Sequence, residues 1–313
     1  MASAAPSTQP SPDSDPLRPP QLVNLQSLAR LLIGRRGWLI LFILLDIYII
    51  YLISSNKEVY DVWVYVLPGL NATIRITVIS FLLAVIIGLV LAFGRISKNL
   101  IIYNVSTFYV EIFRGLPLLV IILLFNFVVT PAIVDVVVGP TPEQGARIPF
   151  LDDLIQRLIG VNPERISTTV LRTRDIDSEL RIVLAFAVTY GAFMSEVFRA
   201  GIQSIGKGQV EAGRSLGMTY IQVMLYIVLP QAIRNVLPAL ANNFVFLLKD
   251  TSLASAVAVS EISYLTRQYS STNFRYPEGL LVLSFLYANL TIVLSMGSVY
   301  LEDRLHRDRR DAR

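Results

Sequence analysis

The sequence ATIRITVISFLLAVIIGLVLAF occupies residues 72–93, and Arg75 is the one charged side chain in it. About 20 mainly apolar residues in a helix cross the hydrocarbon core of a bilayer, because a helix satisfies every backbone polar group internally. The whole chain of 313 residues has a similar character, since 54% of them are apolar and 16% are charged, against about 25% charged residues in soluble domains. The stretch therefore predicts a membrane-spanning helix in a membrane protein.

Five further stretches are candidates for membrane-spanning helices. They are residues 38–53, 101–129, 181–198, 235–248 and 280–300. The first of these carries Asp46, and the stretch 235–248 is interrupted by Asn242 and Asn243. The predicted fold is an all-α membrane protein with about six transmembrane helices.

Composition also excludes several classes of function. The chain has no cysteine and one histidine, His306, which lies in a charged tail. A disulfide framework, a thiolate metal site and a histidine-dependent catalytic triad are therefore excluded. The net charge of +4 is small for this length, and the short basic clusters form no stripe of the kind that binds nucleic acid.

The basic clusters predict the orientation instead, because Lys and Arg accumulate in short cytoplasmic flanks. With six spans, four clusters lie on the same side of the membrane: Arg18, Arg30, Arg35 and Arg36; Arg95 and Lys98; Arg199, Lys207, Arg214 and Arg234; and the arginines after Leu301. Both termini and the segment 200–230 are predicted to be cytoplasmic.

The polar segments outside the spans have separate predictions. Residues 1–36 begin with a Pro- and Ser-rich stretch and are expected to be a disordered cytoplasmic tail, and the first apolar run lies too far from the start for a cleaved signal peptide. Residues 303–313 form a charged cytoplasmic tail. Residues 130–180 form an external insert, in which LDDLIQRLIG (151–160) has the apolar spacing of one amphipathic helix. A spacer without a function of its own explains this insert equally well.

The segment GIQSIGKGQVEAGRSLG (201–217) begins with a near match to the phosphate-binding loop G-x-x-x-x-G-K-[ST]. Such a loop needs a final hydroxyl for Mg²⁺ and a buried strand before it. Here Gly208 takes the last position and a helical stretch precedes the loop, so nucleotide binding is not expected. Residues 210–216 instead favour a short exposed helix ended by Gly217, in which Glu211 and Arg214 share a face. An ordinary polar loop is the alternative.

This segment resembles the signature E-A-A-x-x-x-G-x(9)-I-x-L-P of permease subunits of bacterial binding-protein-dependent ABC importers. Here the matching residues are Glu211, Ala212, Gly213 and Gly217, followed by Ile227-x-Leu229-Pro230. The resemblance is to the polar amino acid branch and covers residues 66–302. It extends over GLNATIRITVIS (69–80), YVEIFRGLPLL (109–119), MSEVFRAGIQSIGKGQ (194–209) and LPQAIRNVLPALANNFVFLLKDTSLAS (229–255).

The resemblance implies a type I importer permease in the bacterial cytoplasmic membrane, which is a transport subunit and not an enzyme. It implies that residues 200–230 contain a coupling helix that docks in a groove of a separate ATPase dimer, which binds the ATP and Mg²⁺, while this chain holds no cofactor. Further implied partners are a second permease subunit, identical or paralogous, an external solute-binding protein and an amino acid substrate. Within the coupling helix, Ala212, Leu216 and Gly217 would enter the groove, with Lys207, Glu211 and Arg214 at its rim.

The chain departs from the family pattern in two respects. Gly213 stands where the family usually has alanine, which weakens helix propensity by up to about 1 kcal/mol. The family core has five spans, so the helix predicted at residues 37–54 and the insert 130–180 are additions whose roles the resemblance does not supply.

Charges within spans are candidate functional residues, because a charge at the centre of a span costs about 2.5–3.5 kcal/mol on insertion scales. Glu111 and Arg114 are spaced to neutralise each other at a kink near Gly115 and Pro117, and Glu196 and Arg199 have the same spacing.

An amino acid substrate needs a cation for its carboxylate and an acceptor for its ammonium group. Arg75 is the first candidate for the carboxylate, because a guanidinium forms two parallel hydrogen bonds with it; snorkelling of Arg75 to the outer surface is the alternative. Asn242, Asn243 and Asp250 are candidates for the other substrate contacts, although asparagines in a span also join helices.

Three other functions stay open. An importer of the same architecture could carry another small organic solute. A secondary transporter driven by an ion gradient would use embedded carboxylates such as Asp46 and Glu111, but it is expected to show two related halves, and no duplication is apparent. A membrane enzyme would need a catalytic cluster, and none is recognisable.

Overall fold

The computed structural model describes residues 37–133 and 177–311, so the predictions for residues 1–36 and for most of the insert 130–180 lie outside the described residues. The chain divides into two compact units, Met1–Ser55 and Asn56–Arg313, which are considered separately. In the first unit the structure describes one helix, α2 (Gly37–Ser55), which is long and apolar enough to cross a membrane. It coincides with the predicted first span.

The second unit is helical throughout its described part, where no strand occurs. Five helical stretches of the described chain, α2 included, are long and apolar enough to span a membrane, and a bent pair of helices would make a sixth. The elements of the second unit are α3 (Lys57–Val66), α4 (Gly69–Ile96), α5 (Leu100–Gly115), α6 (Leu118–Leu124), the π-helical turn η1 (Phe125–Val129), α10 (Ser178–Gln203), α11 (Lys207–Ser215), α12 (Tyr220–Val223), the π-helical turn η3 (Met224–Val228), α13 (Leu229–Asp250), the 3₁₀ segment η4 (Thr251–Val257), α14 (Ile262–Asn273) and α15 (Tyr276–Asp311).

The predicted span 101–129 is not one straight helix. Helices α5 and α6 meet at an angle of 107°, so the prediction needs this correction. Leu116 is extended, with φ −92° and ψ 139°, because the ring of Pro117 disfavours helical geometry in the residue before it. The kink expected near Gly115 and Pro117 is confirmed, and it is sharp enough to separate two helices.

The fifth predicted span, 235–248, is much too short. The helical stretch runs from Tyr220 to Val257 and includes α12, η3, α13 and η4. Pro230 lies in the first turn of α13, where a missing N–H is tolerated, and Pro238 lies inside the helix. Polar residues and prolines lowered the apparent hydrophobicity of both ends of this span without ending the helix.

Helices α4 and α10 form the centre of the second unit. One face of α4 carries a row of small residues that lets the backbones approach closely. A Cβ atom added to Gly88 would lie 2.7 Å from Cβ of Met194, and one added to Gly191 would lie 2.6 Å from Cγ2 of Ile87. The buried small residues of this row are Gly69, Thr73, Thr77, Ser80, Ala84, Gly88 and Ala92.

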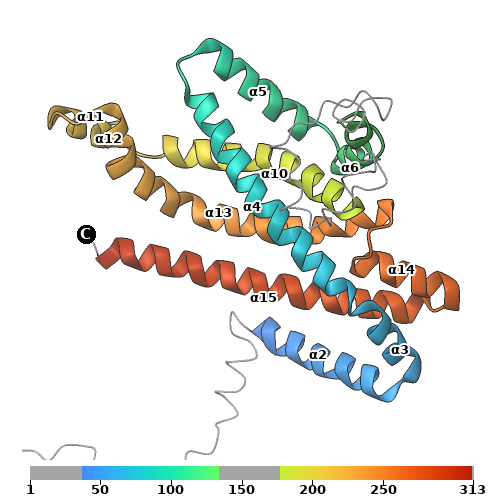
Figure 1. Ribbon diagram of the computed structural model, residues 1–313. Coiled ribbons are helices and arrows are strands. Elements are labelled where there is room, and N and C mark those ends of the chain that lie inside the picture. The colour runs from blue at the N-terminus through green and yellow to red at the C-terminus, as the bar shows by residue number, and fades with distance from the viewer. Residues whose placement is uncertain (1–36, 134–176, 312–313) are drawn as a thin grey trace, which may run out of the picture. The chain divides into compact units, whose positions relative to one another are not determined.

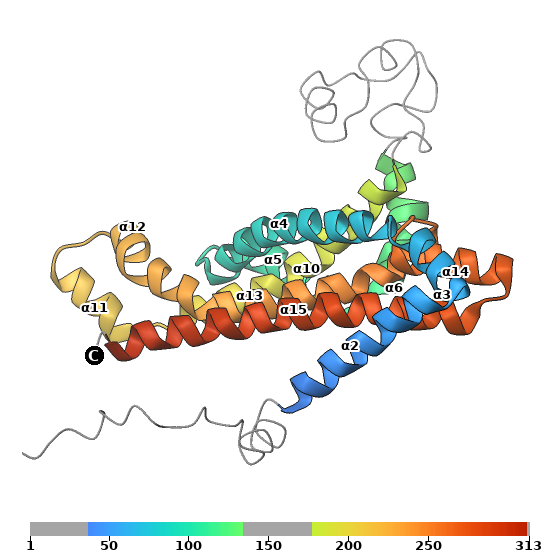
Figure 2. The same cartoon turned by 90° about the horizontal axis from the view of Figure 1, so that it is seen from below.

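The other helices pack around this pair. Helix α13 lies against α10, and α15 runs along α13 (Figures 1 and 2). Helices α11 and α12 project at one end of the unit, and α3 and α14 lie at the opposite end in both views. These are called the α11 end and the α14 end below. The segment predicted as a tail after residue 302 continues α15 as helix to Asp311.

Candidate functional site

Helix α11 is the predicted short helix, and it begins three residues earlier than expected, at Lys207. Gly206 is extended before it, and Gly217 follows it with φ +79°, a conformation that glycine adopts without strain. The N–H of Met218 donates to the carbonyl of Gly213 at 3.2 Å, and the N–H of Gly217 donates to that of Arg214 at 2.9 Å. These two bonds form a Schellman motif, which satisfies the last carbonyls of the helix.

Gly213 is the one buried residue of α11. A Cβ atom at this position would lie 2.7 Å from Cδ1 of Ile227 and 3.0 Å from Cγ2 of Val223. The glycine therefore brings α11 close to α12 and η3, and an alanine would force Ile227 to move. This contact gives a physical reason for the departure from the usual alanine, and it shows that Gly213 faces the chain itself.

The remaining residues predicted to contact a partner are all exposed. Leu216 has 83% of its surface exposed although it is a large apolar side chain. Exposed apolar groups beside charged ones are typical of surfaces that another protein covers. The exposed members of the predicted set are Lys207, Glu211, Ala212, Arg214, Leu216 and Gly217.

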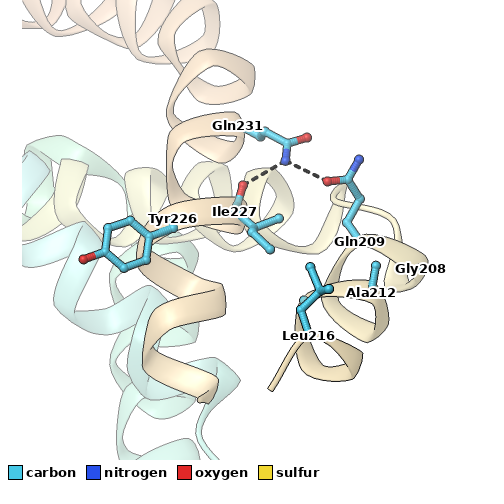
Figure 3. Close-up of a pocket in the computed structure, with 8 residues that line it drawn as sticks. Gly208, Gln209, Ala212, Leu216, Tyr226, Ile227 and Gln231 are labelled. Atoms are coloured by element: carbon cyan, nitrogen blue, oxygen red, sulfur yellow. Dashed lines mark hydrogen bonds between the residues drawn. The ribbon is translucent and has the colours of Figure 1, made fainter. Parts of the chain in front are cut away.

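A cavity of about 540 Å³ lies between α11 and the start of α13, and Figure 3 shows its lining. The side-chain amide of Gln231 donates to Oε1 of Gln209 at 3.1 Å and to the carbonyl of Ile227 at 2.8 Å. This pair of hydrogen bonds is a direct polar link between α11 and α13. The cavity is lined by Gly208, Gln209, Ala212, Gly213, Leu216, Tyr226, Ile227 and Gln231.

Arg75, the first candidate for a substrate carboxylate, forms an ion pair within the chain. Its Nε and Nη2 donate to the two carboxylate oxygens of Glu179 at 2.6 and 2.5 Å. The pair joins α4 to the start of α10, and the Arg75 side chain remains 52% exposed. The geometry is a two-fold guanidinium–carboxylate contact, and its carboxylate is that of Glu179.

The other three candidates lie on α13. Asp250 accepts a hydrogen bond of 2.7 Å from the buried hydroxyl of Tyr190. Asn242 is exposed and Asn243 is half-buried, and no hydrogen bond or ion pair among the described residues connects any of the three to Arg75.

Lys249 was not among the substrate contacts selected from the sequence, where it was noted only as a neighbour of Asp250 that points in another direction and needs a partner of its own. The structure places it on the same exposed face of α13 as Asn242 and Phe246, with its Nζ 5.8 Å from the centre of the Phe246 ring. Asn242, Phe246 and Lys249 are spaced by four and three residues, and this spacing could have predicted from the sequence that they share one face of the helix.

At the α11 end, four charged side chains meet in what we call the Glu196 cluster: Glu196, Arg95, Arg114 and Arg199. The predicted pair of Glu196 and Arg199 is confirmed at 2.7 Å. The predicted pairing of Glu111 with Arg114 is wrong, because Arg114 turns to Glu196 at 3.0 Å and Glu111 lies 3.8 Å from Arg95. Contacts between helices replaced the expected contact within α5.

At the α14 end, Glu261 is fully buried and was not found from the sequence. Its carboxylate caps α14 by accepting from the N–H groups of Ser263 and Tyr264 at 2.8 and 2.6 Å, and from the hydroxyl of Tyr287 at 3.0 Å. Burial raises the pKa of Glu261 above its ordinary value, although these hydrogen bonds act in the opposite direction. In the described part of the chain no group of three His, Cys, Asp or Glu side chains could hold a metal ion.

The bundle of membrane-spanning helices and the short exposed helix at one end define a membrane permease. Residues 84–310 match the family described as binding-protein-dependent transport system inner membrane component, and the chain belongs to that family. Its match to the probable glutamine ABC transporter permease protein GlnM of Bacillus subtilis (strain 168) is 32% identical and covers 79% of this chain and 96% of that protein. The L-cystine transport system permease protein TcyB of the same organism is 31% identical over 78% of this chain and 88% of its own length.

Solved structures resemble the chain in fold. A crystal structure of an amino acid ABC transporter with histidines gives a TM-score of 0.58 at 29% identity and covers 77% of this chain and 94% of that one. The MetNI methionine ABC transporter in an inward-facing conformation gives 0.53 at 18% identity over 75% and 93% of the two chains, a similarity of fold alone. The expected type I importer permease fold is confirmed.

Proposed function

We propose that this chain is the permease subunit of an amino acid importer and that α11 couples it to a separate ATPase. The exposed apolar Leu216 at the end of α11, beside Gly217 and three charged side chains, is the observation that carries the proposal. A helix that buries only Gly213 against its own chain has most of its surface free for a partner. The basic residues around this segment favour a cytoplasmic location for it and for both termini.

The proposed assembly contains two permease chains, an ATPase dimer and an external solute-binding protein. Closure of the ATPase dimer on ATP would move the two α11 helices, and the path between the permeases would open alternately to the two sides. Uphill transport requires a site whose affinity differs between these states. The names of the similar proteins support an amino acid as the solute.

For the solute we retain the four sequence candidates as proposed contacts. Arg75 would bind the substrate carboxylate by exchanging Glu179 for it, since the two carboxylates would make the same pair of hydrogen bonds. Asp250 would accept from the substrate ammonium, and Asn242 and Asn243 would make amide contacts. The exposed face of α13 adds Lys249 as a second cation for a carboxylate.

A copurification tests the coupling role. The tagged chain is purified from its native membrane under mild detergent, and the retained proteins are identified by mass spectrometry. An ABC ATPase is expected with the unchanged chain, and Leu216→Asp is expected to lose it by more than about tenfold, because a charge would replace an apolar contact at the centre of the docking surface.

The matched control is Tyr276→Asp, which places the same charge on a side chain that is also exposed but lies at the start of α15, outside residues 200–230. It is expected to retain the ATPase. Equal retention by the Leu216→Asp chain would show that α11 is not the docking element, and an unchanged chain that retains no ATPase would argue for a transporter driven by an ion gradient.

A further inference from the structure

Movement of α11 has to reach the membrane-spanning helices if it is to change the access of a solute site. Helix α10 ends at Gln203, and α11 begins at Lys207. A displacement of α11 therefore acts on the last turns of α10, in addition to the polar link from Gln209 on α11 to Gln231 on α13. Glu196 lies about two turns before the end of this helix.

The Glu196 carboxylate is fully engaged by three arginines. Its Oε1 accepts from Nη1 of Arg95 at 2.6 Å and from Nη1 of Arg114 at 3.0 Å. Its Oε2 accepts from Nε and Nη2 of Arg199 at 3.1 and 2.7 Å. One carboxylate thus holds four N–H groups, and hydrogen bonds between charged partners are stronger than neutral ones.

The three arginines come from three helices. Arg95 lies at the end of α4, Arg114 at the end of α5, and Arg199 on α10 beside Gln203, whose Oε1 accepts from it at 3.4 Å. The carboxylate therefore joins α10, the helix that leads into α11, to the C-terminal ends of α4 and α5.

The Glu196 carboxylate is needed to balance the positive charges of the three arginines in the cluster. Without Glu196, three guanidinium groups would face one another, and the Arg95 side chain is only 8% exposed. Its Nε already lacks a hydrogen-bond partner among the described residues. Glu111 compensates less well, because it is 66% exposed and its carboxylate lies 3.8 Å from Arg95, against 2.6 Å for Glu196.

We propose that Glu196 is a positioning residue that transmits the movement of α11 to α4 and α5 through Arg95 and Arg114. The inference rests on the proposed function, because it assumes that an ATPase moves α11. It goes further by assigning the connection from α10 to α4 and α5 to one carboxylate, beside the Gln209–Gln231 link from α11 to α13.

The test is Glu196→Gln in the full complex, which removes the charge and keeps the size of the side chain. Three quantities are measured: ATPase retained by the tagged chain, ATP hydrolysis by the purified complex, and uptake of a radiolabelled L-amino acid mixture by cells with the variant as their only copy. Uptake per ATP hydrolysed by the same amount of complex is expected to fall by at least about fivefold, the lower end of the range of coupling between two sites. A residue that only stabilises the fold would lower the amount of complex and leave this ratio unchanged.

The control is Glu58→Gln, which removes another ion pair between elements, the one with Arg275 at the α14 end. Its ratio is expected to stay within about twofold of the unchanged chain. A Glu196→Gln ratio that also stays within about twofold overturns the proposal.

A second variant covers the case in which Glu196→Gln does not reach the membrane. Arg114→Met removes only the contact with α5 and leaves the two other arginines paired with Glu196. A reduced ratio in this variant supports the proposal, and an unchanged ratio overturns it. Failure of the proposed function would be seen separately, as an unchanged chain that retains no ATPase or supports no uptake.

Discussion

Glycines occur both in the interface between α4 and α10 and on the exposed side of α11 and its C-terminal turn, but their surroundings are opposite. Gly88 and Gly191 lie where atoms of the facing helix leave no room for a side chain. Gly208 and Gly217 have no atom near the position that a Cβ would take. Gly88 and Gly191 allow two helices of the chain to pack closely, whereas Gly208 and Gly217 lie on an exposed surface. Small residues therefore accompany close approach in the first place, whereas at Gly208 and Gly217 no described atom lies near the position of a Cβ.

The same substitution at both places gives the strongest test of this difference. Gly88→Ala is expected to lower the free energy of unfolding by up to about 3 kcal/mol, because the added methyl overlaps Met194 and a packed interface resists expansion. Gly208→Ala is expected to leave it unchanged or raise it slightly, because alanine favours helix. Thermal unfolding of the purified protein in detergent measures both. Equal effects of the two substitutions would contradict the assigned packing.

The end of α11 gives a smaller and more local effect. Gly217→Val is expected to destabilise the Schellman motif by about 1–2 kcal/mol, because a side chain disfavours the left-handed conformation. Gly217→Asn, which tolerates that conformation, is expected to cost less. Amide hydrogen exchange should become faster in α11, while the unfolding temperature of the bundle stays unchanged. The reason is that a segment of low local stability can open without unfolding of the whole protein. A lower unfolding temperature for the whole protein would mean that α11 supports the bundle.

The hydrogen bond between Tyr190 and Asp250 tests how much a polar contact inside the bundle contributes to stability. Tyr190→Phe removes the hydroxyl that donates to Asp250. It is expected to cost about 0.6 kcal/mol and no more than about 1.7 kcal/mol, the average and the maximum for hydrogen bonds between membrane helices. The control is Tyr300→Phe, since Tyr300 is largely exposed. Thermal unfolding of both variants measures the difference. An equal effect of the two changes would show that the bond to Asp250 adds nothing to stability.

The smallest effect is a dependence on pH at the α14 end. Glu261 has a raised pKa in the folded protein, so the folded state binds its proton more tightly than the unfolded state does. Its contribution to stability is therefore lost as the pH rises from the ordinary glutamate range through the raised pKa. Glu261→Gln is expected to flatten the stability curve over that interval. A curve that is unchanged by Glu261→Gln would assign the dependence to other groups.

The sequence predicted the class of fold because long apolar segments have few alternatives in a bilayer. It also predicted α11, since a short polar segment with its glycines lies between two spans. The lengths of the spans were less predictable: prolines and asparagines in α13 suggested interruptions that neighbouring helices tolerate, and the 107° bend at Leu116 was expected only as a kink.

The candidate site was predictable in its exposed part and less so where several helices meet. Residue spacing on α5 suggested that Arg114 contacts Glu111, but the partner lies on α10. In the same way, Arg75 was recognised as a carboxylate ligand without its partner Glu179. Spacing along one helix does not encode which other helix passes within reach of a long side chain, so contacts of this type need coordinates.

The length of α15 has a consequence for measurement. The helix contains 36 residues, and at 1.5 Å per residue it extends about 54 Å, well beyond the roughly 30 Å of bilayer hydrocarbon. If it behaves as a rigid rod pivoting at one end, a change in tilt of about 10° displaces the other end by about 9 Å. A spectroscopic probe attached at the end of this rod would convert a small rotation within the bilayer into a distance large enough to follow during each transport cycle.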